Sequence, residues 1–561
     1  MKKFSIGTVL IGIVLTLGFL VIPTRIGSTG ENLHVMDISV GPHAAKPLHP
    51  KIDGALARDI QNALYGGPQI PYPLLRRSSE NPAGDEISVV IETQLFQTAI
   101  GFHPEVKILR GMVESFGGEI EAEAGNLIKT RLSPQAILTL ANNDLVRLIR
   151  RPLQPTPDEY VSEGVHAIGA DLWHNLTTYR MTPRNVKIAI LDAGFKGYTG
   201  LLGSDLPTSV AARSFRTDGD IFADQVHGTA CAEIVHDMAP NASLYLVNSS
   251  NEVTFGNAVD YLVGQNVDII SYSMGWFNAG AGNGTGPICE TVSRATNQGI
   301  LWANSAGNYA EAHWEGTFSD SDNDRFLNFS GIDEIIDFYV PSYTAVSVFL
   351  NWDDWGIWNG SSYSGSNQDY DLALWYWTGS NWIFVDASVG WQDGSQWPVE
   401  AIGGWYSTVG TYWGVSIYKY RSTRNCKHEL FVLGNSQPVE YHVDAGSISI
   451  PSDLPAAMAT GAISWSDDSY HYYSSRGPTH DGRTKPDYCA PSGVSTSSYG
   501  TRSFFGTSAS APHLAGALGL ILTKTNYTAT QAVYIIDARI LDLGTAGKDN
   551  VFGLGRIKLS K

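Results

Sequence analysis

The segment Val186-Lys187-Ile188-Ala189-Ile190-Leu191-Asp192 decides which fold we expect for this chain of 561 residues. It is an almost continuous apolar run, which is typical of a strand buried on both faces of a parallel sheet. The run ends at Asp192. Open α/β sheets place their active sites at the carboxyl ends of such strands, so Asp192 is the first candidate site residue.

Strands and helices alternate around this segment. We expect further strands at Ser243–Val247 and Val267–Ser271, with a helix at Phe255–Val263 between them. The same texture returns near residue 447 and continues to the end of the chain. This alternation predicts a doubly wound α/β domain with a mostly parallel sheet, formed by residues 160–314 and 447–561.

The residues between these two parts, 315–446, have a different character. Short runs of Trp, Tyr, Val and Ile are separated by Gly, Asn, Ser and Asp. This pattern is typical of an antiparallel sandwich, so we expect an all-β sandwich inserted into the α/β domain. The expected strands include Ala345–Trp352, Leu372–Trp377, Trp382–Val385 and Trp413–Tyr418.

Residues 86–153 are expected to form a separate small α+β domain. The predicted order of strand, helix, strand, strand, helix, strand is that of the ferredoxin-like fold. Pro104 is expected to start the first helix, and Ser133 to cap the second through its hydroxyl oxygen. The expected strands are Ile87–Thr93, Glu119–Glu123, Leu127–Leu132 and Leu145–Ile149.

The segments before this domain are interpreted from their composition. Two lysines precede an apolar run at residues 4–23, which is the pattern of a secretory signal. Residues 1–26 are therefore a signal peptide, or a signal anchor if residues 4–23 stay in the membrane; in both cases the rest of the chain is extracellular. Residues 27–85 are rich in Pro, Gly and small polar residues and are interpreted as a poorly ordered leader or linker.

Charge and cysteine content narrow the range of functions. The formal net charge is −18, which argues against nucleic-acid binding because that needs basic patches. The four cysteines, at positions 231, 289, 426 and 489, allow three disulfide pairings. Cys231 and Cys489 lie in apolar segments, so for these two residues buried free thiols are at least as good an interpretation as a disulfide. The spacing of the four cysteines does not indicate a zinc site.

Two further segments supply the groups that a nucleophilic serine requires. A serine hydroxyl needs a base to remove its proton, and that base needs a carboxylate to fix its tautomer. His227 opens an apolar helix in His227-Gly228-Thr229-Ala230-Cys231-Ala232. Ser508 opens another in Gly506-Thr507-Ser508-Ala509-Ser510-Ala511-Pro512-His513, where a main-chain N–H at the helix N-terminus can stabilise an oxyanion.

The segments around Asp192, His227 and Ser508, in this order, resemble the subtilase (subtilisin-like) family of serine peptidases. The resemblance covers about residues 160–308 and 447–561. It implies acyl transfer, with Ser508 as nucleophile, His227 as general base and Asp192 as the carboxylate that orients the base.

The resemblance also implies further site residues. Ala303–Asn308 is similar to the family's oxyanion segment, which makes the side-chain amide of Asn308 the second oxyanion donor. Ser273, Met274 and Gly275 are similar to the strand that pairs with the substrate main chain. Ala306 and Gly307 are expected to line the substrate site.

By the same resemblance, residues 86–153 look like the family's inhibitory propeptide, an intramolecular inhibitor that is removed by self-cleavage. Its expected exit strand is Val146–Pro152, and we place the cut between about residues 150 and 160. Arg150-Arg151 could mark the site of a second protease, although surface arginines are the simpler interpretation.

The chain departs from the family in two places. Ala193 stands where Ser or Thr usually follows the catalytic aspartate, which should leave the triad intact. Only Asp237–Ala242 separate the His227 helix from the next strand, so we expect the calcium-binding loop of many subtilases to be absent there.

No cofactor is required for the predicted chemistry, no catalytic metal is expected, and structural calcium is left unassigned. Asp353-Asp354 and Asp369-Tyr370-Asp371 in the expected sandwich could supply oxygen ligands for calcium. Loop carboxylates at strand ends are the simpler interpretation of both pairs.

We therefore expect a secreted serine endopeptidase, self-processed from a zymogen, that acts on protein or peptide substrates. The alternative is a catalytically silent surface protein of the same fold, which binds peptides or glycans through the inserted sandwich. Contact with a membrane is expected only if the N-terminal segment is retained.

Overall fold

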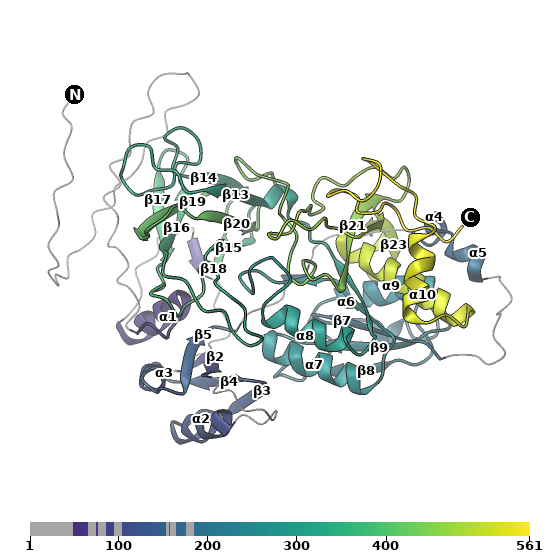
Figure 1. Cartoon of the computed structure of the whole chain (residues 1–561), viewed down its shortest axis with the longest axis horizontal. Coiled ribbons are helices and arrows are strands. Elements are labelled where there is room, and N and C mark those ends of the chain that lie inside the picture. The colour runs from purple at the N-terminus through teal and green to yellow at the C-terminus, as the bar shows by residue number, and fades with distance from the viewer. Residues whose placement is uncertain are drawn as a thin grey trace.

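The computed structural model describes residues 49–65, 74–76, 86–94, 104–152, 156–157, 164–174 and 185–560. Figure 1 shows a large α/β body, a body of β-strands beside it, and a small unit of helices and strands below the latter. The predicted signal or anchor at 1–26 lies outside the described residues. Among the helices that are described, none is long and apolar enough to cross a membrane.

A seven-stranded parallel sheet forms the α/β body (Figure 1). Its strands are β7 (Lys187–Asp192), β8 (Ala211–Ser214), β9 (Ser243–Asn248), β10 (Ile269–Tyr272), β12 (Leu301–Ser305), β21 (Ala457–Ser464) and β22 (Tyr488–Ser492). They lie in the order β22-β21-β12-β10-β7-β9-β8, so β7 has neighbours on both sides. The predicted parallel α/β fold is confirmed.

Helices cover both faces of this sheet because the side chains of each strand alternate between the faces. Ile188 and Ile190 of β7 pack in one core with α6, α9 and α10, while Ala189 and Leu191 pack in the opposite core with α7 and α8. The helices are α4 (Val165–Ile168), α5 (Ala170–His174), α6 (His227–Met238), α7 (Glu252–Gly264), α8 (Pro287–Thr296), α9 (Thr507–Lys524) and α10 (Ala529–Asp537). Two short strands, β23 (Val494–Thr496) and β24 (Gly500–Phe504), form a hairpin before α9.

Two antiparallel sheets lie between β12 and β21 in the chain, and we call residues 313–433 the insert. Their strands are β13 (His313–Thr317), β14 (Ile336–Val340), β15 (Thr344–Trp352), β16 (Asp369–Trp377), β17 (Trp382–Ser388), β18 (Val399–Ser407), β19 (Thr411–Arg421) and β20 (Lys427–Leu433). One sheet has the order β18-β15-β20-β13 and the other β14-β19-β16-β17. Apolar side chains of both sheets, such as Val348 and Leu372, share one core.

The small unit is built from residues 86–152, which we call the N-terminal unit. Its elements are β2 (Ile87–Thr93), α2 (Pro104–Ser115), β3 (Ile120–Ala124), β4 (Leu127–Leu132), α3 (Pro134–Ala141) and β5 (Val146–Arg150). The sheet order is β3-β4-β2-β5. Ser133 caps α3 as predicted, because its hydroxyl oxygen accepts a hydrogen bond from the N–H of Ala136 at 3.3 Å.

Part of segment 27–85 is folded, which corrects its interpretation as a poorly ordered linker. Helix α1 (Gly54–Tyr65) places Leu56 and Ile60 in the core of the N-terminal unit. Strand β1 (Leu74–Arg76) extends the first sheet of the insert by pairing with β18. The average composition of the segment misled the prediction, because it concealed the apolar face that Leu56 and Ile60 form at a spacing of four residues.

Arg150 and Arg151 are not simple surface arginines, which corrects the sequence-based interpretation. Arg150 is 5% exposed, and its Nε lies 2.7 Å from Oε1 of Glu92. Its guanidinium also pairs with Glu252 at the start of α7. Arg151 pairs with Asp59 of α1. Buried charges require such partners, and the Arg150–Glu252 pair joins the N-terminal unit to the α/β body.

The insert contacts the α/β body through a carboxylate and an imidazole. Oε1 of Glu429 in β20 lies 3.0 Å from Nε2 of His480, and Nδ1 of His480 lies 2.9 Å from the carbonyl oxygen of Ala281. Both partners accept hydrogen bonds, so both ring nitrogens donate and the imidazole carries its extra proton. The charge of Glu429 raises the pKa of His480 to about 9. Burial acts to raise the pKa of Glu429, but the charges and hydrogen bonds of His480 and His313 together outweigh burial and lower the pKa.

Replacing His480 with glutamine is expected to lower the thermal midpoint of the full chain by about 2–5 °C near pH 6, and much less near pH 10. A raised histidine pKa contributes stability that is fully present below the unfolded value of 6.5 and is lost as the pH rises through about 9. At low pH the stability is limited by Glu429, whose pKa is lowered in the folded state. Its contribution to the stability of the fold is lost as the pH falls below about 4.5. Calorimetric scans at several pH values measure the effect.

The matched control for this variant is Arg294→Gln. It breaks the exposed Arg294–Asp260 pair, whose Nη2–Oδ1 distance is 3.0 Å, and exposed pairs contribute little. We expect a change of less than about 1 °C for the control at every pH. If His480→Gln lowered the thermal midpoint equally near pH 6 and near pH 10, the lost interaction would not be the ion pair with Glu429.

Candidate active site

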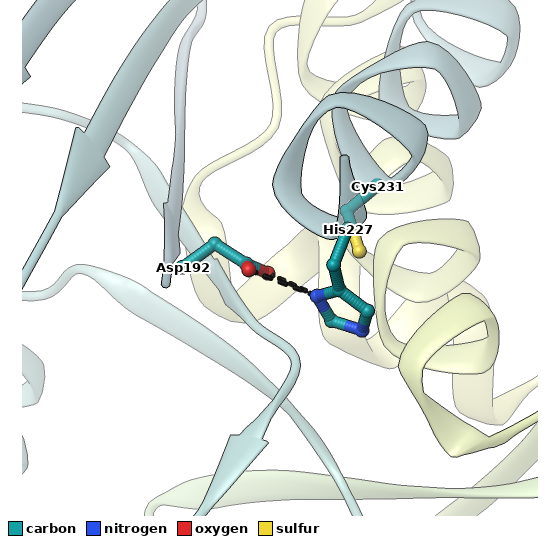
Figure 2. Close-up of side chains that lie close together, drawn as sticks. All are labelled: Asp192, His227 and Cys231. Atoms are coloured by element: carbon teal, nitrogen blue, oxygen red, sulfur yellow. Dashed lines mark hydrogen bonds and ion pairs between the residues drawn. The ribbon is translucent and has the colours of Figure 1, made fainter. Parts of the chain in front are cut away.

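Asp192 and His227 meet at the carboxyl edge of the parallel sheet (Figure 2). Asp192 is the last residue of β7 and His227 is the first residue of α6. Nδ1 of His227 lies 2.8 Å from Oδ1 and 2.9 Å from Oδ2 of Asp192. An ionised carboxylate only accepts hydrogen bonds, so it favours the tautomer with the proton on Nδ1. That tautomer leaves Nε2 able to accept a proton.

The close approach of β7 and α6 depends on a glycine. A Cβ atom at Gly228 would lie 2.6 Å from the carbonyl oxygen of Gly194 and 2.8 Å from Cβ of Asp192, so no larger residue fits without a shift. The pair is also shielded from water, since Asp192 is 2% exposed and His227 3%. Low exposure strengthens the hydrogen bond between the two side chains.

Asp192 keeps a fixed orientation although Ala193 offers no hydroxyl group. Its Oδ1 accepts a hydrogen bond from the N–H of Ala193 at 2.7 Å. The main chain therefore supplies a contact that does not depend on the side chain at position 193. This is consistent with the expectation that the substitution leaves the aspartate in place.

Ser508 lies in the first turn of α9 and is fully buried. The helix starts after Gly506, whose φ of 121° is a conformation that glycine adopts without strain. The N–H of Gly506 donates to the hydroxyl oxygens of Tyr473 at 2.9 Å and Ser492 at 2.8 Å. These contacts fix where the helix begins, and hence where Ser508 stands.

The main chain of Ser508 lies against the helix that carries His227. Its carbonyl oxygen accepts a hydrogen bond from the thiol of Cys231 at 3.5 Å. Cys231 stands one turn after His227 on α6, as Figure 2 shows. The same carbonyl oxygen accepts a hydrogen bond from the hydroxyl of Ser273 at 2.7 Å. The structure thus brings together segments around residues 192, 227, 273 and 508.

All four cysteines are buried free thiols, which for Cys231 and Cys489 is one of the two interpretations that the sequence left open. The Sγ of Cys231 and the ligand atoms of Asp192 and His227 lie within 4.8 Å of one another. Because Cys231 contacts the Ser508 carbonyl, we interpret it as a packing residue between α6 and α9.

The side chain of Asn308 is held at one end, and its other end has no partner among the described residues. Its Oδ1 accepts hydrogen bonds from the N–H and the hydroxyl of Thr507, at 2.9 and 3.0 Å. Its Nδ2 is buried and donates to none of the described residues. A buried N–H group without a partner costs about 1–3 kcal/mol, so its presence calls for a functional reason. Thr507 directly precedes Ser508, so this amide group is tied to the nucleophile segment.

The segment predicted to pair with a substrate is paired with the chain itself. Strand β11 (Met274–Gly275) runs antiparallel to β6 (Thr156–Pro157), with Met274 opposite Pro157 and Gly275 opposite Thr156. This is strand addition of the kind expected for a peptide substrate. The residue before β11, Ser273, is the one that contacts the Ser508 carbonyl.

Ala306 and Gly307 have main-chain groups that are already engaged. The N–H of Ala306 donates to the carbonyl oxygen of Thr460 at 3.0 Å, and the N–H of Gly307 donates to the hydroxyl oxygen of Thr507 at 3.2 Å. In this state these two residues can form a wall of a substrate site but cannot pair with a substrate main chain through those N–H groups.

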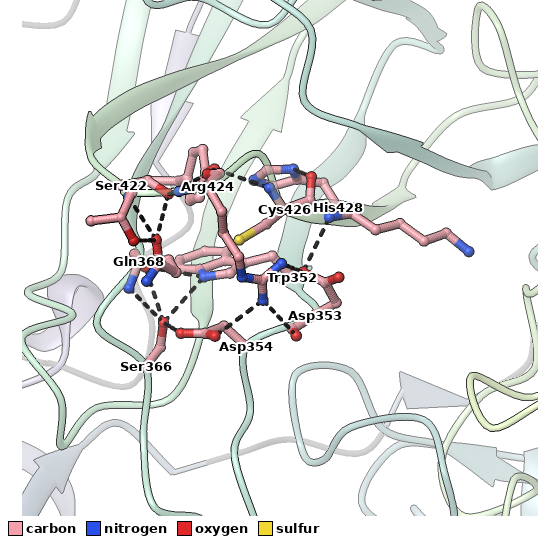
Figure 3. Close-up of polar contacts among 12 residues, drawn as sticks. Trp352, Asp353, Asp354, Ser366, Gln368, Ser422, Arg424, Cys426 and His428 are labelled. Carbon is pink, nitrogen blue, oxygen red and sulfur yellow. Dashed lines mark hydrogen bonds and ion pairs between the residues drawn. The ribbon is translucent and has the colours of Figure 1, made fainter.

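The aspartates considered as calcium ligands are engaged in other contacts. Arg424 reaches Oδ1 of Asp353 at 2.8 Å and Oδ1 of Asp354 at 3.0 Å, as Figure 3 shows. The guanidinium supplies the positive charge that an ion would bring, which favours the structural interpretation. Asp369 and Asp371 are buried in β16, at 0% and 8% exposure.

Sequence reasoning missed a different acidic group. Asp320, Asp322 and Asp324 lie in the loop between β13 and β14, and their ligand oxygens lie within 4.8 Å of one another. The signal that would have found them is the aspartate at every second position in Asp320-Ser321-Asp322-Asn323-Asp324.

The fold and the site define a doubly wound α/β protein with an aspartate–histidine pair at the carboxyl edge of its sheet. The profile of the subtilase family, Peptidase S8, matches residues 183–329 and 388–555, more than half of the chain. The chain belongs to the subtilase family.

Comparison with individual proteins gives more distant similarities. The chain is 24% identical over 217 residues to a thermostable alkaline protease of Halalkalibacterium halodurans, covering 36% of this chain and 58% of that protein. It is 24% identical over 196 residues to the minor extracellular protease Epr of Bacillus subtilis, covering 30% of this chain and 29% of that one. The chain therefore matches less than two thirds of the length of either relative. Among solved structures, the CspB protease of Clostridium perfringens is 14% identical, with a TM-score of 0.45 and coverage of 70% of this chain and 96% of that one.

Proposed function

We propose that this chain is a serine endopeptidase that hydrolyses peptide bonds in protein or peptide substrates. The observation that carries the proposal is the Asp192–His227 pair, buried at the carboxyl edge of a subtilase-family sheet. The Ser508 main chain packs against the same helix, which supports a shared role for the three residues.

The proposed reaction is acyl transfer. His227 takes the proton of the Ser508 hydroxyl at Nε2 while Asp192 stabilises the resulting imidazolium. The Ser508 oxygen attacks the peptide carbonyl carbon, and the amide of Asn308 and the N–H of Ser508 stabilise the oxyanion. His227 then gives its proton to the leaving amine, and water releases the acyl group.

We further propose that the N-terminal unit is an inhibitory propeptide that the enzyme removes itself. The chain after this unit pairs with β11, as a bound peptide would. Its antiparallel direction, from Thr156 opposite Gly275 to Pro157 opposite Met274, leads toward Ser273 and the Ser508 carbonyl. We therefore propose that the chain is cut shortly after Pro157, at a peptide bond within residues 158–160.

Expressed without residues 1–26, the parent chain is expected to cut itself within residues 158–160 and to react with a fluorophosphonate probe at Ser508. The Ser508→Ala variant should do neither, because it lacks the nucleophile. The matched control is Ser510→Ala, which removes a buried hydroxyl of the same helix that only donates to the Ala490 carbonyl at 3.0 Å. It should behave like the parent. Mass spectrometry of the new N-terminus detects self-cleavage, and mass spectrometry of the labelled peptide detects the reaction of the probe with Ser508.

The alternative, a catalytically silent surface protein that binds peptides or glycans, predicts a different result. Parent and Ser508→Ala chains would then both stay full length and neither would take up the probe. The aligned Asp192–His227 pair and the unpartnered Asn308 amide favour the peptidase, because a binding protein has no use for either.

We propose secretion on the basis of the lysines and apolar run at residues 1–26, with membrane attachment only if residues 4–23 are retained. One matched relative is named as an extracellular protease.

A further inference from the structure

Three aspartates gather at the start of the insert, outside the elements that carry the residues of the proposed triad. Asp320, Asp322 and Asp324 each offer a carboxylate oxygen, and these oxygens lie within 4.8 Å of one another. Oxygens bound to one calcium ion at 2.3–2.6 Å lie at most about 5 Å apart. The three carboxylates are therefore spaced as ligands of a single ion.

A fourth carboxyl group comes from the other end of the same loop. Glu334 is 5% exposed, and its Oε2 is buried without a hydrogen-bond partner among the described residues. Its carboxyl group is in hydrogen-bonding contact with that of Asp324, one member of the aspartate group. Two carboxylates in such contact repel each other unless a proton or a cation lies between them.

No basic side chain balances these four groups within the described part of the chain. The largest charge effects at Glu334 and Asp324 come from the acids of the group itself. Asp353 and Asp354 differ from this group, because Arg424 pairs with both of them and neutralises their charge (Figure 3).

The spacing agrees with a known kind of calcium loop. In EF-hand loops, positions 1, 3 and 5 supply side-chain ligands and a glycine at position 6 makes the turn. Counting from Asp320, the sixth residue is Arg325, whose φ of 79° is the left-handed conformation that glycine supplies there. The loop differs from an EF-hand because strands flank it and because its buried glutamate comes later, at Glu334.

We propose that Asp320, Asp322, Asp324 and Glu334 bind one calcium ion. Calcium takes six to eight oxygen ligands, so water or main-chain carbonyls would complete the shell. The number and charge of the carboxylates suit calcium better than magnesium, which prefers one or two carboxylates and several retained waters.

The position of the loop indicates what the ion does. The loop leads from β13 in one sheet of the insert to β14 in the other. The N–H of Leu327 donates to Ile417 in β19 at 2.9 Å, and the N–H of Lys419 donates to the Arg325 carbonyl at 2.8 Å. The ion therefore stabilises the corner where the chain crosses between the two sheets.

Calorimetric titration of the full chain carrying Ser508→Ala tests the proposal, after removal of ions with EDTA. We expect one site per chain that Asp322→Asn weakens at least tenfold. Asp322 is exposed and makes no side-chain hydrogen bond among the described residues, so this variant should fold. At a calcium concentration of about 100 times Kd, the thermal midpoint should rise by several degrees in Ser508→Ala and not in Asp320→Ala/Asp324→Ala.

The matched control is Asp353→Asn, an aspartate of the same insert that already pairs with Arg424. It should leave calcium binding unchanged. Absence of binding in millimolar calcium, or equal binding by Ser508→Ala and by its Asp322→Asn form, would overturn the proposal. Magnesium binding as tight as calcium binding would overturn the assignment of the ion. These outcomes do not depend on peptidase activity, so the site and the proposed function stand or fall separately.

Discussion

Replacing His227 with alanine is expected to lower kcat by about 10⁶-fold, and adding Ser508→Ala should lower it no further. The reason is that the proposed base and nucleophile act as one unit: without a base at Nε2, the Ser508 hydroxyl keeps its proton. Nδ1 of His227 lies within 2.9 Å of both oxygens of Asp192, so the ring is held by the carboxylate and not by the substrate. KM should therefore change little.

The measurement uses a fluorogenic peptide and variants whose N-terminal unit has been removed by immobilised parent enzyme. The control is His236→Ala on the same helix, in which the removed imidazole is nine residues further along and its pKa is lowered by burial. It should retain nearly full kcat. If the reductions in kcat of the two single variants multiplied in the double variant, His227 and Ser508 would act independently. That result would contradict a shared mechanism.

The sequence predicted those parts of the molecule that depend on contacts between near neighbours in the chain. The continuous apolar run before Asp192 predicted a strand buried on both faces, and β7 packs against helices on both sides. Ser133 was predicted to cap a helix from its position before Pro134, and its hydroxyl does so. The candidate residues at 192 and 227 were recognised from short segments, and their contact followed from the topology of a parallel sheet.

Contacts between distant segments could not be predicted in this way. The pairing of Arg424 with Asp353 joins residues 71 positions apart, and nothing in either segment specifies the other. Thr507 was not predicted as the partner of Asn308, which is 199 positions away. The folded part of 27–85 was missed for a different reason, because the average composition of the segment concealed the local apolar spacing of Leu56 and Ile60.

The amide of Asn308 is the group whose loss should reduce turnover most after the triad. Asn308→Ala is expected to lower kcat by about 100–1,000-fold with little change in KM, because an oxyanion donor acts mainly on the transition state. Its Nδ2 has no hydrogen-bond partner among the described residues, so the folded protein loses no contact of that atom. The thermal midpoint should consequently change by only a few degrees, which separates this effect from unfolding.

Thr507→Val tests whether the amide must also be held in place. The variant removes the hydroxyl that donates to Oδ1 of Asn308 at 3.0 Å but keeps the main-chain N–H that donates at 2.9 Å. One of the two anchors remains, so we expect kcat to fall by only about 3–10-fold, the equivalent of one ordinary hydrogen bond. Combined with Asn308→Ala, Thr507→Val should add only the effect of losing the hydrogen bond from the Gly307 N–H, because no amide is left to position. If the two reductions in kcat were fully additive in free energy, Thr507 would act independently of the amide. An unchanged kcat in Asn308→Ala would exclude Asn308 as an oxyanion donor.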